Sequence, residues 1–126
     1  MLIRSYRVRG HLEARLDPLG LQVPPAHPEL SLAFCGFEEK DLDRRIFIDN
    51  MLGLETATVR EIVERLRATY CGPIGVEFMH IQDPGQKAWI QQQVEGAPWN
   101  GAFDKAAKRH ILTQLTEAEG FEAFCA

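Results

Sequence analysis

Apolar residues recur at helical spacing through the middle of the chain, where a strong start signal precedes them. Thr58-Val59-Arg60-Glu61 is a capping box, in which each of the two outer side chains accepts a hydrogen bond from the other residue's amide. The apolar positions that follow are spaced i, i+3, i+4, i+7 and i+11, and they are Val59, Ile62, Val63, Leu66 and Tyr70. Gly72-Pro73 supplies a stop. The pattern predicts a helix that begins after Thr58 and ends near Tyr70.

A second amphipathic helix is predicted at the start of the chain. The apolar residues that recur there near helical spacing are Leu2, Tyr6, Leu12 and Leu16. They predict a helix within residues 1–16, from about Ile3 to Leu16. No capping side chain precedes this helix, so we expect that it was cut on its N-terminal side. Asp17-Pro18-Leu19-Gly20 ends it, because the residue before a proline is pushed out of helical geometry.

Residues 17–57 are expected to form an irregular segment. From Leu21 to Ala57 the helix-breaking residues are Pro24, Pro25, Pro28, Gly36 and Gly53. Only two short elements are predicted there, an acidic helix over Glu38–Arg45 and an extended piece at Ile46-Phe47-Ile48. So long a stretch without regular structure is uncommon inside a compact domain. We therefore expect the segment to wrap against another part of the protein.

Residues 58–126 are predicted to be helical throughout. Asp83-Pro84-Gly85-Gln86 begins a helix that directs Trp89, Ile90 and Val94 to the core. After a break at Gly96-Ala97-Pro98, Asp104 caps the next helix. The apolar residues of that helix are Ala107, Ile111, Leu112 and Leu115. A last helix is predicted from a second capping box, and the residues that define it are Thr116, Glu119, Phe121 and Phe124.

The expected fold class is mainly α. The elements predict a small helical bundle with a long irregular proline-containing segment and short extended pieces, in a single domain that covers residues 1–126. Both ends look truncated, because the first helix lacks a cap and the last has about one turn after Gly120. We therefore expect a fragment of a larger protein.

Composition excludes several classes of function. The 126 residues are 45% hydrophobic and 25% charged, as in ordinary globular proteins, and no window approaches the length of a membrane span. The net charge is -4 with acidic and basic residues interleaved, so no positive surface for nucleic acid is expected. The cysteines Cys35, Cys71 and Cys125 are odd in number and widely spaced, which indicates reduced thiols.

The residues capable of acid, base or nucleophile chemistry lack partners in the sequence. The histidines are His11, His27, His80 and His110. Asp83 lies close to His80, but its position favours a helix cap over a catalytic pair. Cys35 or Cys71 would need an imidazole beside it to act as a nucleophile. We interpret Cys71 as a small buried residue, the commoner state of a free cysteine.

No metal, nucleotide or cofactor site is predicted. The acidic residues Glu38, Glu39, Asp41 and Asp43 are crowded enough to attract a cation weakly. They alternate with Lys40 and Arg44, which favours a solvated charged surface. No Cys or His spacing fits zinc, and no glycine-rich loop fits a phosphate. We therefore assign no catalytic, cofactor-binding or metal-binding residue.

Five separate blocks of sequence carry a resemblance to a known family. They are Tyr6-Arg7-Val8-Arg9-Gly10-His11 with Leu16-Asp17-Pro18-Leu19-Gly20, Leu52-Gly53-Leu54-Glu55-Thr56, Tyr70-Cys71-Gly72-Pro73-Ile74-Gly75-Val76-Glu77-Phe78-Met79-His80-Ile81, Trp89-Ile90-Gln91, and Leu115-Thr116-Glu117-Ala118-Glu119-Gly120-Phe121-Glu122. In order and spacing they resemble the thiamine-dependent 2-oxoglutarate dehydrogenases, specifically the N-terminal helical portion of the decarboxylating first component. The resemblance covers essentially the whole chain.

The resemblance implies a role in the citric acid cycle. The parent enzyme of such a family decarboxylates 2-oxoglutarate with thiamine diphosphate and magnesium, and passes a succinyl group to the lipoyl arm of the dihydrolipoyl succinyltransferase. It is a homodimeric α/β enzyme in which the matching helical portion packs against the first cofactor-binding domain. The family's Gly-Asp-Gly cofactor motif and active-site histidines lie further along, and this chain contains no Gly-Asp-Gly. We expect the fragment alone to be inactive, and leave open whether His11 or His80 approaches the active site.

One departure from the family pattern bears on the source. Animal members have a second histidine after Arg-Gly-His and an acidic cluster linked with calcium, where this chain has Leu12 and Val23-Pro24-Pro25. A bacterial, cytoplasmic member without calcium regulation is expected, or a mitochondrial matrix protein if the source is eukaryotic. Two alternatives stay open: a free-standing interaction module derived from this domain, and a fragment of a 2-oxoadipate dehydrogenase.

Overall fold

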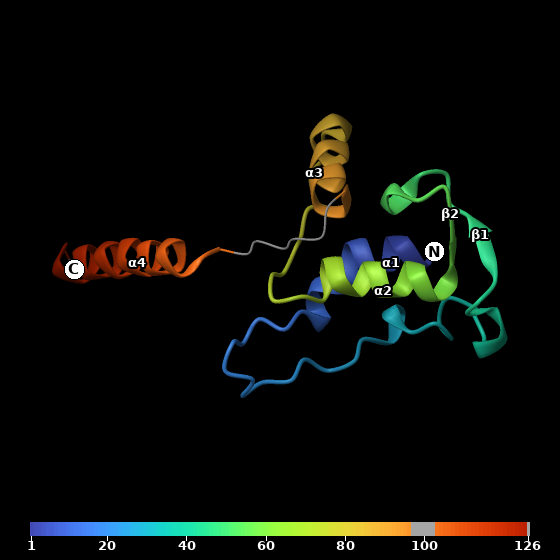
Figure 1. The fold of residues 1–126 in the computed structure, drawn as a ribbon, viewed down its shortest axis with the longest axis horizontal. Helices are drawn as coiled ribbons and strands as arrows, with labels where there is room; N and C mark the ends of the chain where they lie inside the picture. The colour runs from blue at the N-terminus through green and yellow to red at the C-terminus, as the bar shows by residue number, and fades with distance from the viewer. Residues whose placement is uncertain (97–102, 126) are drawn as a thin grey trace.

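The computed structural model describes residues 1–96 and 103–125. Within these ranges the protein is mainly α, as expected (Figure 1). Its regular elements are α1 (Leu2–Arg9), β1 (Arg45–Phe47), β2 (Thr56–Thr58), α2 (Val59–Tyr70), α3 (Pro84–Gly96) and α4 (Lys105–Cys125). Short 3-10 turns occur at Gly10–Glu13, Pro28–Leu30, Glu39–Asp41 and Met51–Gly53.

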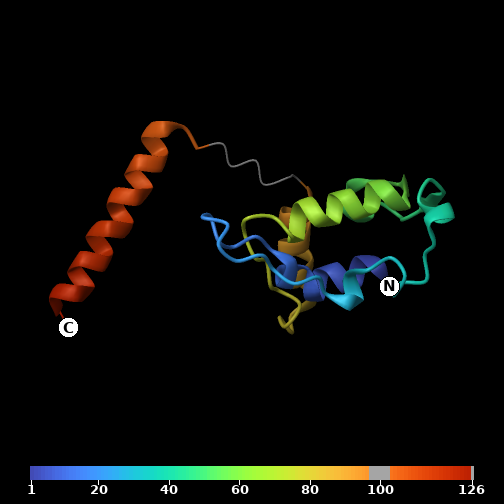
Figure 2. The ribbon, with the colours of Figure 1, turned by 90° about the horizontal axis from the view of Figure 1, so that it is seen from below.

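The core forms where α1 and α2 lie side by side and run in the same direction (Figures 1 and 2). Its largest fully buried side chains are Tyr6, Leu52, Val59, Leu66 and Tyr70. The capping box predicted for α2 is present: the Thr58 amide donates to Glu61 Oε2 at 2.7 Å, and the Glu61 amide donates to Thr58 Oγ1 at 3.2 Å. The predicted start, end and buried face of α2 are therefore confirmed.

Helix α1 is shorter than the sequence predicts. It ends at Arg9 and continues only as a 3-10 turn, so Leu12 and Leu16 are 41% and 61% exposed instead of buried. Tertiary contacts replace the helical hydrogen bonds after this point, because the Arg15 amide donates to the Gly72 carbonyl at 2.9 Å. The prediction of a helix to Leu16 was therefore wrong.

The irregular segment contains less helix than predicted. The acidic stretch Glu38–Arg45 forms only the 3-10 turn Glu39–Asp41, since Asp41 accepts the Glu38 amide at 3.0 Å and β1 begins at Arg45. The predicted extended piece is confirmed as β1, which pairs antiparallel with β2 so that Ile46 lies opposite Ala57.

Asp17 organises the turn that follows the first helical region. Its carboxylate accepts backbone amides of Leu19, Leu21 and Gln22 at 2.8, 2.7 and 2.9 Å. These bonds lower the pKa of Asp17, with the Leu19 amide contributing most. Gly20 follows with a φ of 68°, a conformation that glycine adopts without strain. The predicted reversal at this site is confirmed.

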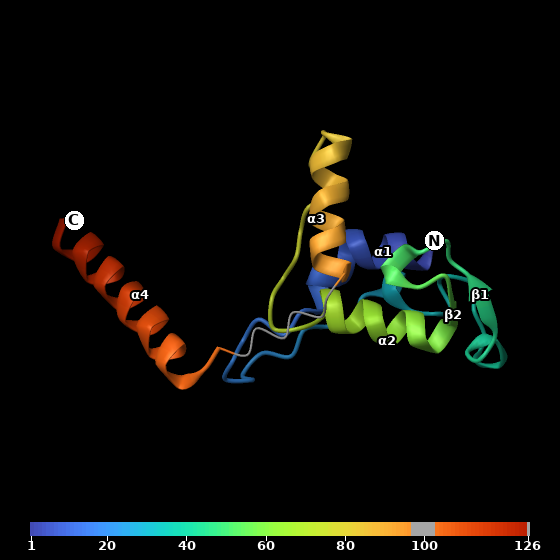
Figure 3. The ribbon, with the colours of Figure 1, turned by 45° about the horizontal axis from the view of Figure 1, so that its top comes forward.

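Helix α3 begins at its predicted cap and contacts the core near its C-terminal end (Figure 3). Asp83 Oδ1 accepts the Gln86 amide at 2.7 Å. Ile90 and Val94 pack against the core, as predicted. Trp89 is 62% exposed, so its assignment to the core was wrong. Figure 3 shows the start of α3 projecting away from α1 and α2.

A single helix, α4, replaces the two helices predicted near the C-terminus. Asp104 caps it as predicted, accepting the Ala107 amide at 2.7 Å. The second capping box is absent, because the Thr116 hydroxyl donates to the Leu112 carbonyl at 2.8 Å inside the continuous helix. The large apolar side chains of this stretch are exposed, and they are Ile111, Leu112, Leu115, Phe121 and Phe124. Figure 1 shows α4 apart from the other elements.

One sequence prediction falls on residues that the structure does not describe. The predicted break at Ala97-Pro98 lies outside the described residues. Among the helices of the described ranges, none combines the length and apolar character needed to cross a membrane.

Two glycines differ in the room around them, and this difference predicts the effect of replacing each by alanine. A Cβ atom at Gly10 would lie 2.5 Å from the Tyr70 Cβ, so Gly10→Ala is expected to lower the free energy of unfolding by about 2 kcal/mol. Gly120 lies within α4 with open space around its Cα, so Gly120→Ala is expected to raise it by up to about 1 kcal/mol. Urea denaturation of both variants measures these changes, and equal stability of the Gly10→Ala variant and the parent would contradict the close contact.

Candidate functional site

A buried polar network joins α1, α2 and α3. Arg7 binds Glu95 in a two-point ion pair, with Nε to Oε1 at 2.7 Å and Nη2 to Oε2 at 2.9 Å. The Tyr70 hydroxyl donates to Glu95 Oε1 at 2.6 Å. Glu95 is 6% exposed and is the one buried residue of α3. Each of the three helices therefore contributes one member of the network.

Each side chain of the network has a hydrogen-bond partner within it, and burial together with this pairing shifts the pKa values of Tyr70 and Arg7. Burial raises the pKa of the Tyr70 hydroxyl, and the neighbouring Glu95 carboxylate raises it further. Burial disfavours the charge on Arg7, but its hydrogen bonds to Glu95 outweigh that effect and raise the pKa of the guanidinium. Tyr70 stays neutral and Arg7 stays charged near neutral pH. The arrangement connects the three helices through charged and hydroxyl groups.

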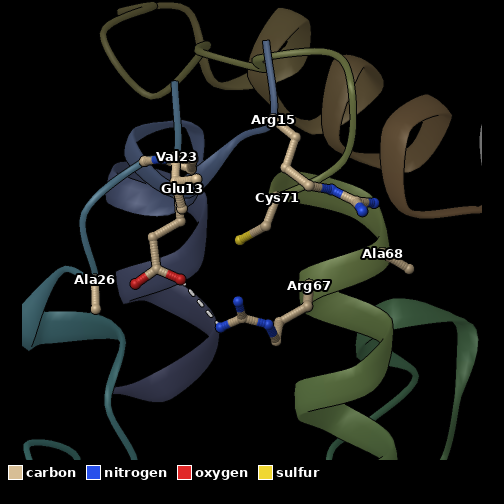
Figure 4. A pocket seen from close by; sticks show the side chains of 8 residues that line it. Glu13, Arg15, Val23, Ala26, Arg67, Ala68 and Cys71 are labelled. Carbon is tan, nitrogen blue, oxygen red and sulfur yellow. Dashed lines mark hydrogen bonds and ion pairs between the residues drawn. The ribbon is translucent and has the colours of Figure 1, made fainter. Parts of the chain in front are cut away.

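A cavity of about 510 Å³ lies beside the network, between the Gly10–Glu13 turn, the following segment and the end of α2 (Figure 4). Its lining residues are Glu13, Arg15, Val23, Pro24, Ala26, Arg67, Ala68 and Cys71. In Figure 4 the Cys71 thiol points between Glu13 and Arg67, and the guanidinium of Arg15 is turned toward Ala68.

Glu13 holds the walls of this cavity together. Its Oε1 accepts the His27 amide at 2.7 Å, and its Oε2 accepts Nη1 of Arg67 at 3.0 Å. The Arg15 amide fixes the opposite wall through its bond to the Gly72 carbonyl. The loop between Glu13 and His27 is thus closed at its base on α2, and the cavity lies within that closure.

Cys71 has the character of a buried structural thiol, as predicted. It is 6% exposed, and its Sγ donates to the Gly10 carbonyl at 3.5 Å. Burial raises the pKa of this thiol, although the Arg67 guanidinium opposes the shift. A protonated thiol is a weak nucleophile. No histidine lines the cavity, so the arrangement of a cysteine with an imidazole base is not formed there.

The other cysteines are also free thiols. Cys35 is half-buried, with its Sγ 4.0 Å from the Glu29 carbonyl oxygen, and Cys125 is exposed on α4.

The histidines are dispersed over the described structure. His80 is exposed in a turn, and the neighbouring Asp83 is engaged as the cap of α3. His27 caps a 3-10 turn, its Nδ1 accepting the Glu29 amide at 3.3 Å. His110 is exposed on α4. His11 is half-buried, and its Nδ1 has no hydrogen-bond partner within the described ranges.

The crowded acidic residues of the irregular segment are mostly paired with cations. The pairs are Glu38 with Lys40 at 2.6 Å, Asp41 with Arg44 at 3.5 Å, and Asp43 with Arg60 at 3.1 Å. The Arg60 hydrogen bonds lower the pKa of Asp43. In the described part of the chain, no group of three or more His, Cys, Asp or Glu side chains is arranged to hold a metal ion.

Sequence similarity identifies the family of the chain. No family model matches it. It is 57% identical over 125 residues to the 2-oxoglutarate dehydrogenase E1 components of Brucella anthropi, Brucella canis and Brucella suis. The match covers 98% of this chain and spans 12% of the length of these relatives.

The match and the fold together define a helical segment of a dehydrogenase component. The chain belongs to the 2-oxoglutarate dehydrogenase E1 family, as its sequence blocks predict, and it corresponds to an N-terminal portion of the members.

Two of the blocks that carry the resemblance meet in the structure. Gly10 and Arg7 come from the first block, and Tyr70 and Cys71 begin the third. Gly10 lies against the Tyr70 ring and accepts the Cys71 thiol, while Arg7 and Tyr70 share Glu95. Sequence reasoning missed Glu95. The available signal was its place as the sole acidic residue of α3, next to the core residue Val94.

Removal of the Glu95 charge is expected to destabilise the fold. Glu95→Gln keeps the side-chain shape but leaves the buried Arg7 guanidinium without a counter-charge, at a cost of about 3 kcal/mol in the free energy of unfolding. Glu77→Gln is the matched control, because Glu77 is exposed, and a change within about 0.5 kcal/mol is expected for it. Urea denaturation that finds the two variants equally stable would contradict the role of the network.

The ionisation of tyrosine provides a second test. The chain has two tyrosines, Tyr6 and Tyr70, and burial raises both pKa values above the ordinary 10.0. The folded state favours the neutral phenols, so this stabilisation is complete below about pH 10 and is lost as the pH rises above it.

We expect no tyrosinate absorbance from the native protein near pH 10, and a single rise that coincides with alkaline unfolding. The urea-unfolded chain should titrate near pH 10 and serves as the control. Titration of both phenols near pH 10 in a protein that keeps its helical circular dichroism would show that they are not buried.

Proposed function

We propose that the chain is a non-catalytic helical part of a 2-oxoglutarate dehydrogenase E1 component. The observation that supports this is the 57% identity over 98% of the chain. The parent enzyme would decarboxylate 2-oxoglutarate in the citric acid cycle, with thiamine diphosphate and magnesium as cofactors. It would pass the succinyl group to the lipoyl group of the dihydrolipoyl succinyltransferase. A bacterial, cytoplasmic homodimer is the form we propose.

The described residues do not fit the cofactors of that reaction. Magnesium bound to a diphosphate prefers oxygen ligands, chiefly carboxylates and carbonyls. Glu13 is the one carboxylate that lines the large cavity, and its two oxygens are engaged by the His27 amide and by Arg67. The cofactors are therefore proposed to bind elsewhere in the parent enzyme, and no catalytic step is assigned to this chain.

Structural support of the parent is the role we propose for the segment. Helix α4 has a row of residues on one face at i, i+4, i+8, i+11 and i+14, and they are Ala107, Ile111, Leu115, Ala118 and Phe121. The row is exposed apart from the half-buried Ala107, although a helix normally covers such a face. The chain spans 12% of its relatives, so we propose that other parts of the polypeptide cover this face.

The proposal is tested by comparing two expressed proteins. One is the complete reading frame that includes these residues, and the other is the 126-residue chain. With thiamine diphosphate and magnesium, the complete protein is expected to release carbon dioxide from 2-oxoglutarate, and the chain alone is expected to release none. Tight, magnesium-dependent binding of thiamine diphosphate to the chain alone, measured by calorimetry, would contradict the non-catalytic assignment.

Substrate choice is measured in the same experiment. 2-Oxoadipate has one more methylene than 2-oxoglutarate, a difference that enzymes discriminate by roughly 10-fold or more in kcat/KM. We expect the complete protein to prefer 2-oxoglutarate. A preference for 2-oxoadipate would assign the chain to a dehydrogenase of that substrate instead.

A further inference from the structure

The charges of α4 are divided between its two halves. Its lysine and arginine residues all lie within residues 105–109, and its glutamates all lie within residues 117–122. These side chains are exposed, and no ion pair of the described structure involves them. The helix therefore presents a positive half followed by a negative half.

This order of charges is unfavourable for α4 as a solvated helix. The N-terminal end of a helix carries a partial positive charge and its C-terminal end a partial negative charge, so cations at the start and carboxylates at the end destabilise it. The first turn of α4 contains no acidic residue and its last turn no basic residue, although Asp104 precedes the helix as its cap. The opposite order of charges would stabilise the helix in water.

Two of these charges lie beside the apolar row of α4. Lys108 and Glu122 are spaced seven residues on either side of Leu115, and residues two turns apart share one side of a helix. Glu122 also lies at i+4 from Ala118, within the row. Arg109, by contrast, is two residues from Ile111 and lies on the opposite side of the helix.

Any element that covers the row also removes water from Lys108 and Glu122. Burying a charge without a partner is costly, and that cost would oppose the apolar contact. A stable cover therefore needs a carboxylate beside Lys108 and a cation beside Glu122. The row extends over about four turns of α4, a length that suits a second helix lying along it.

We propose that α4 is covered by a helix of the parent polypeptide that places carboxylates beside Lys108 and cations beside Glu122. The inference rests on the proposed function, in which other parts of the polypeptide cover the apolar row. The cover is recognised by two features, its apolar contact with the row and its order of charges. The charges that destabilise a solvated α4 then stabilise it in the complete protein.

Hydrogen exchange of the α4 amides tests the proposal in the complete protein and in the 126-residue chain. In the complete protein, K108E and E122K are each expected to speed this exchange at least about tenfold, because each places like charges together at the covered row. R109E is the matched control, since it reverses the neighbouring cation on the opposite side of α4, and its rates are expected to stay at those of the parent.

The separate chain is expected to respond with the opposite sign. There K108E and E122K improve the match between the charges and the helix dipole, so exchange should slow about two- to fivefold. K108Q and E122Q, which remove attraction without adding repulsion, provide a second measurement in the complete protein if a reversed charge prevents folding. Thermal unfolding of each variant shows whether it is folded.

Three results in the complete protein would overturn the proposal. The first is exchange in K108E and E122K at the rates of the parent. The second is equal acceleration in K108E and R109E, which would show that position beside the row has no effect. The third is loss of α4 protection on dilution, which would identify a second copy as the cover.

Failure of the proposed function gives a different result. Amides of α4 that exchange as fast in the complete protein as in the separate chain would show that the row is uncovered, against both proposals. Slow exchange that is insensitive to charge reversal would contradict only the charge order of the covering helix. Neither measurement depends on carbon dioxide release from 2-oxoglutarate.

Discussion

Tyr70 is the residue through which the packing of the three N-terminal helices is fixed. Its ring lies against Gly10, where α1 comes so close that no side chain fits, and its hydroxyl binds the buried Glu95 of α3. Glu95 in turn takes the two-point ion pair from Arg7 of α1. Apolar contact brings two helices together, and the polar network then selects where the third helix attaches. A buried ion pair of this kind requires accurate geometry, because desolvation of both charges opposes it.

The geometry at Tyr70 also determines where the cavity forms. Helix α1 ends at Arg9, next to its close approach to α2 at Gly10, and the chain continues through the 3-10 turn that contains Glu13. Glu13 then binds Arg67 one turn before the end of α2. The cavity therefore forms where α1 and α2 end beside each other, and its charged lining residues lie at or just after those ends. The contacts between the helix ends and the lining of the cavity therefore involve the same few residues.

Local chemistry made part of this fold predictable from sequence. The caps at Thr58, Asp83 and Asp104 were correct, because a capping side chain bonds amides within its own turn and needs no distant partner. Thr116 shows the limit of that logic. Its spacing to Glu119 fits a capping box, but inside a continuous helix the hydroxyl bonds back to the preceding turn. The family assignment came from the order of separate blocks, which does not require any knowledge of the fold.

Long-range contacts were not predictable from periodicity. The spacing of Leu12 and Leu16 fits α1, but α1 ends at Arg9 and the Arg15 amide bonds the Gly72 carbonyl just after α2. The pairing of Arg7 with Glu95 joins positions 88 residues apart, and no local sequence pattern predicts it. For α4 the apolar periodicity predicts a helix, but the apolar side chains stay exposed within the described residues. A period shows that a face is apolar, but it does not show which molecule covers that face.

The exposed row on α4 has a practical consequence for the behaviour of the separate chain in solution. A helix of 21 residues is about 30 Å long, so its apolar side chains form a strip that water must hydrate along that whole length. Two such strips from different molecules can cover each other at little entropic cost beyond association. The 126-residue chain would then sediment as a concentration-dependent mixture, with a helical content that rises with protein concentration. Dilution would favour the monomer and, with it, fraying of α4.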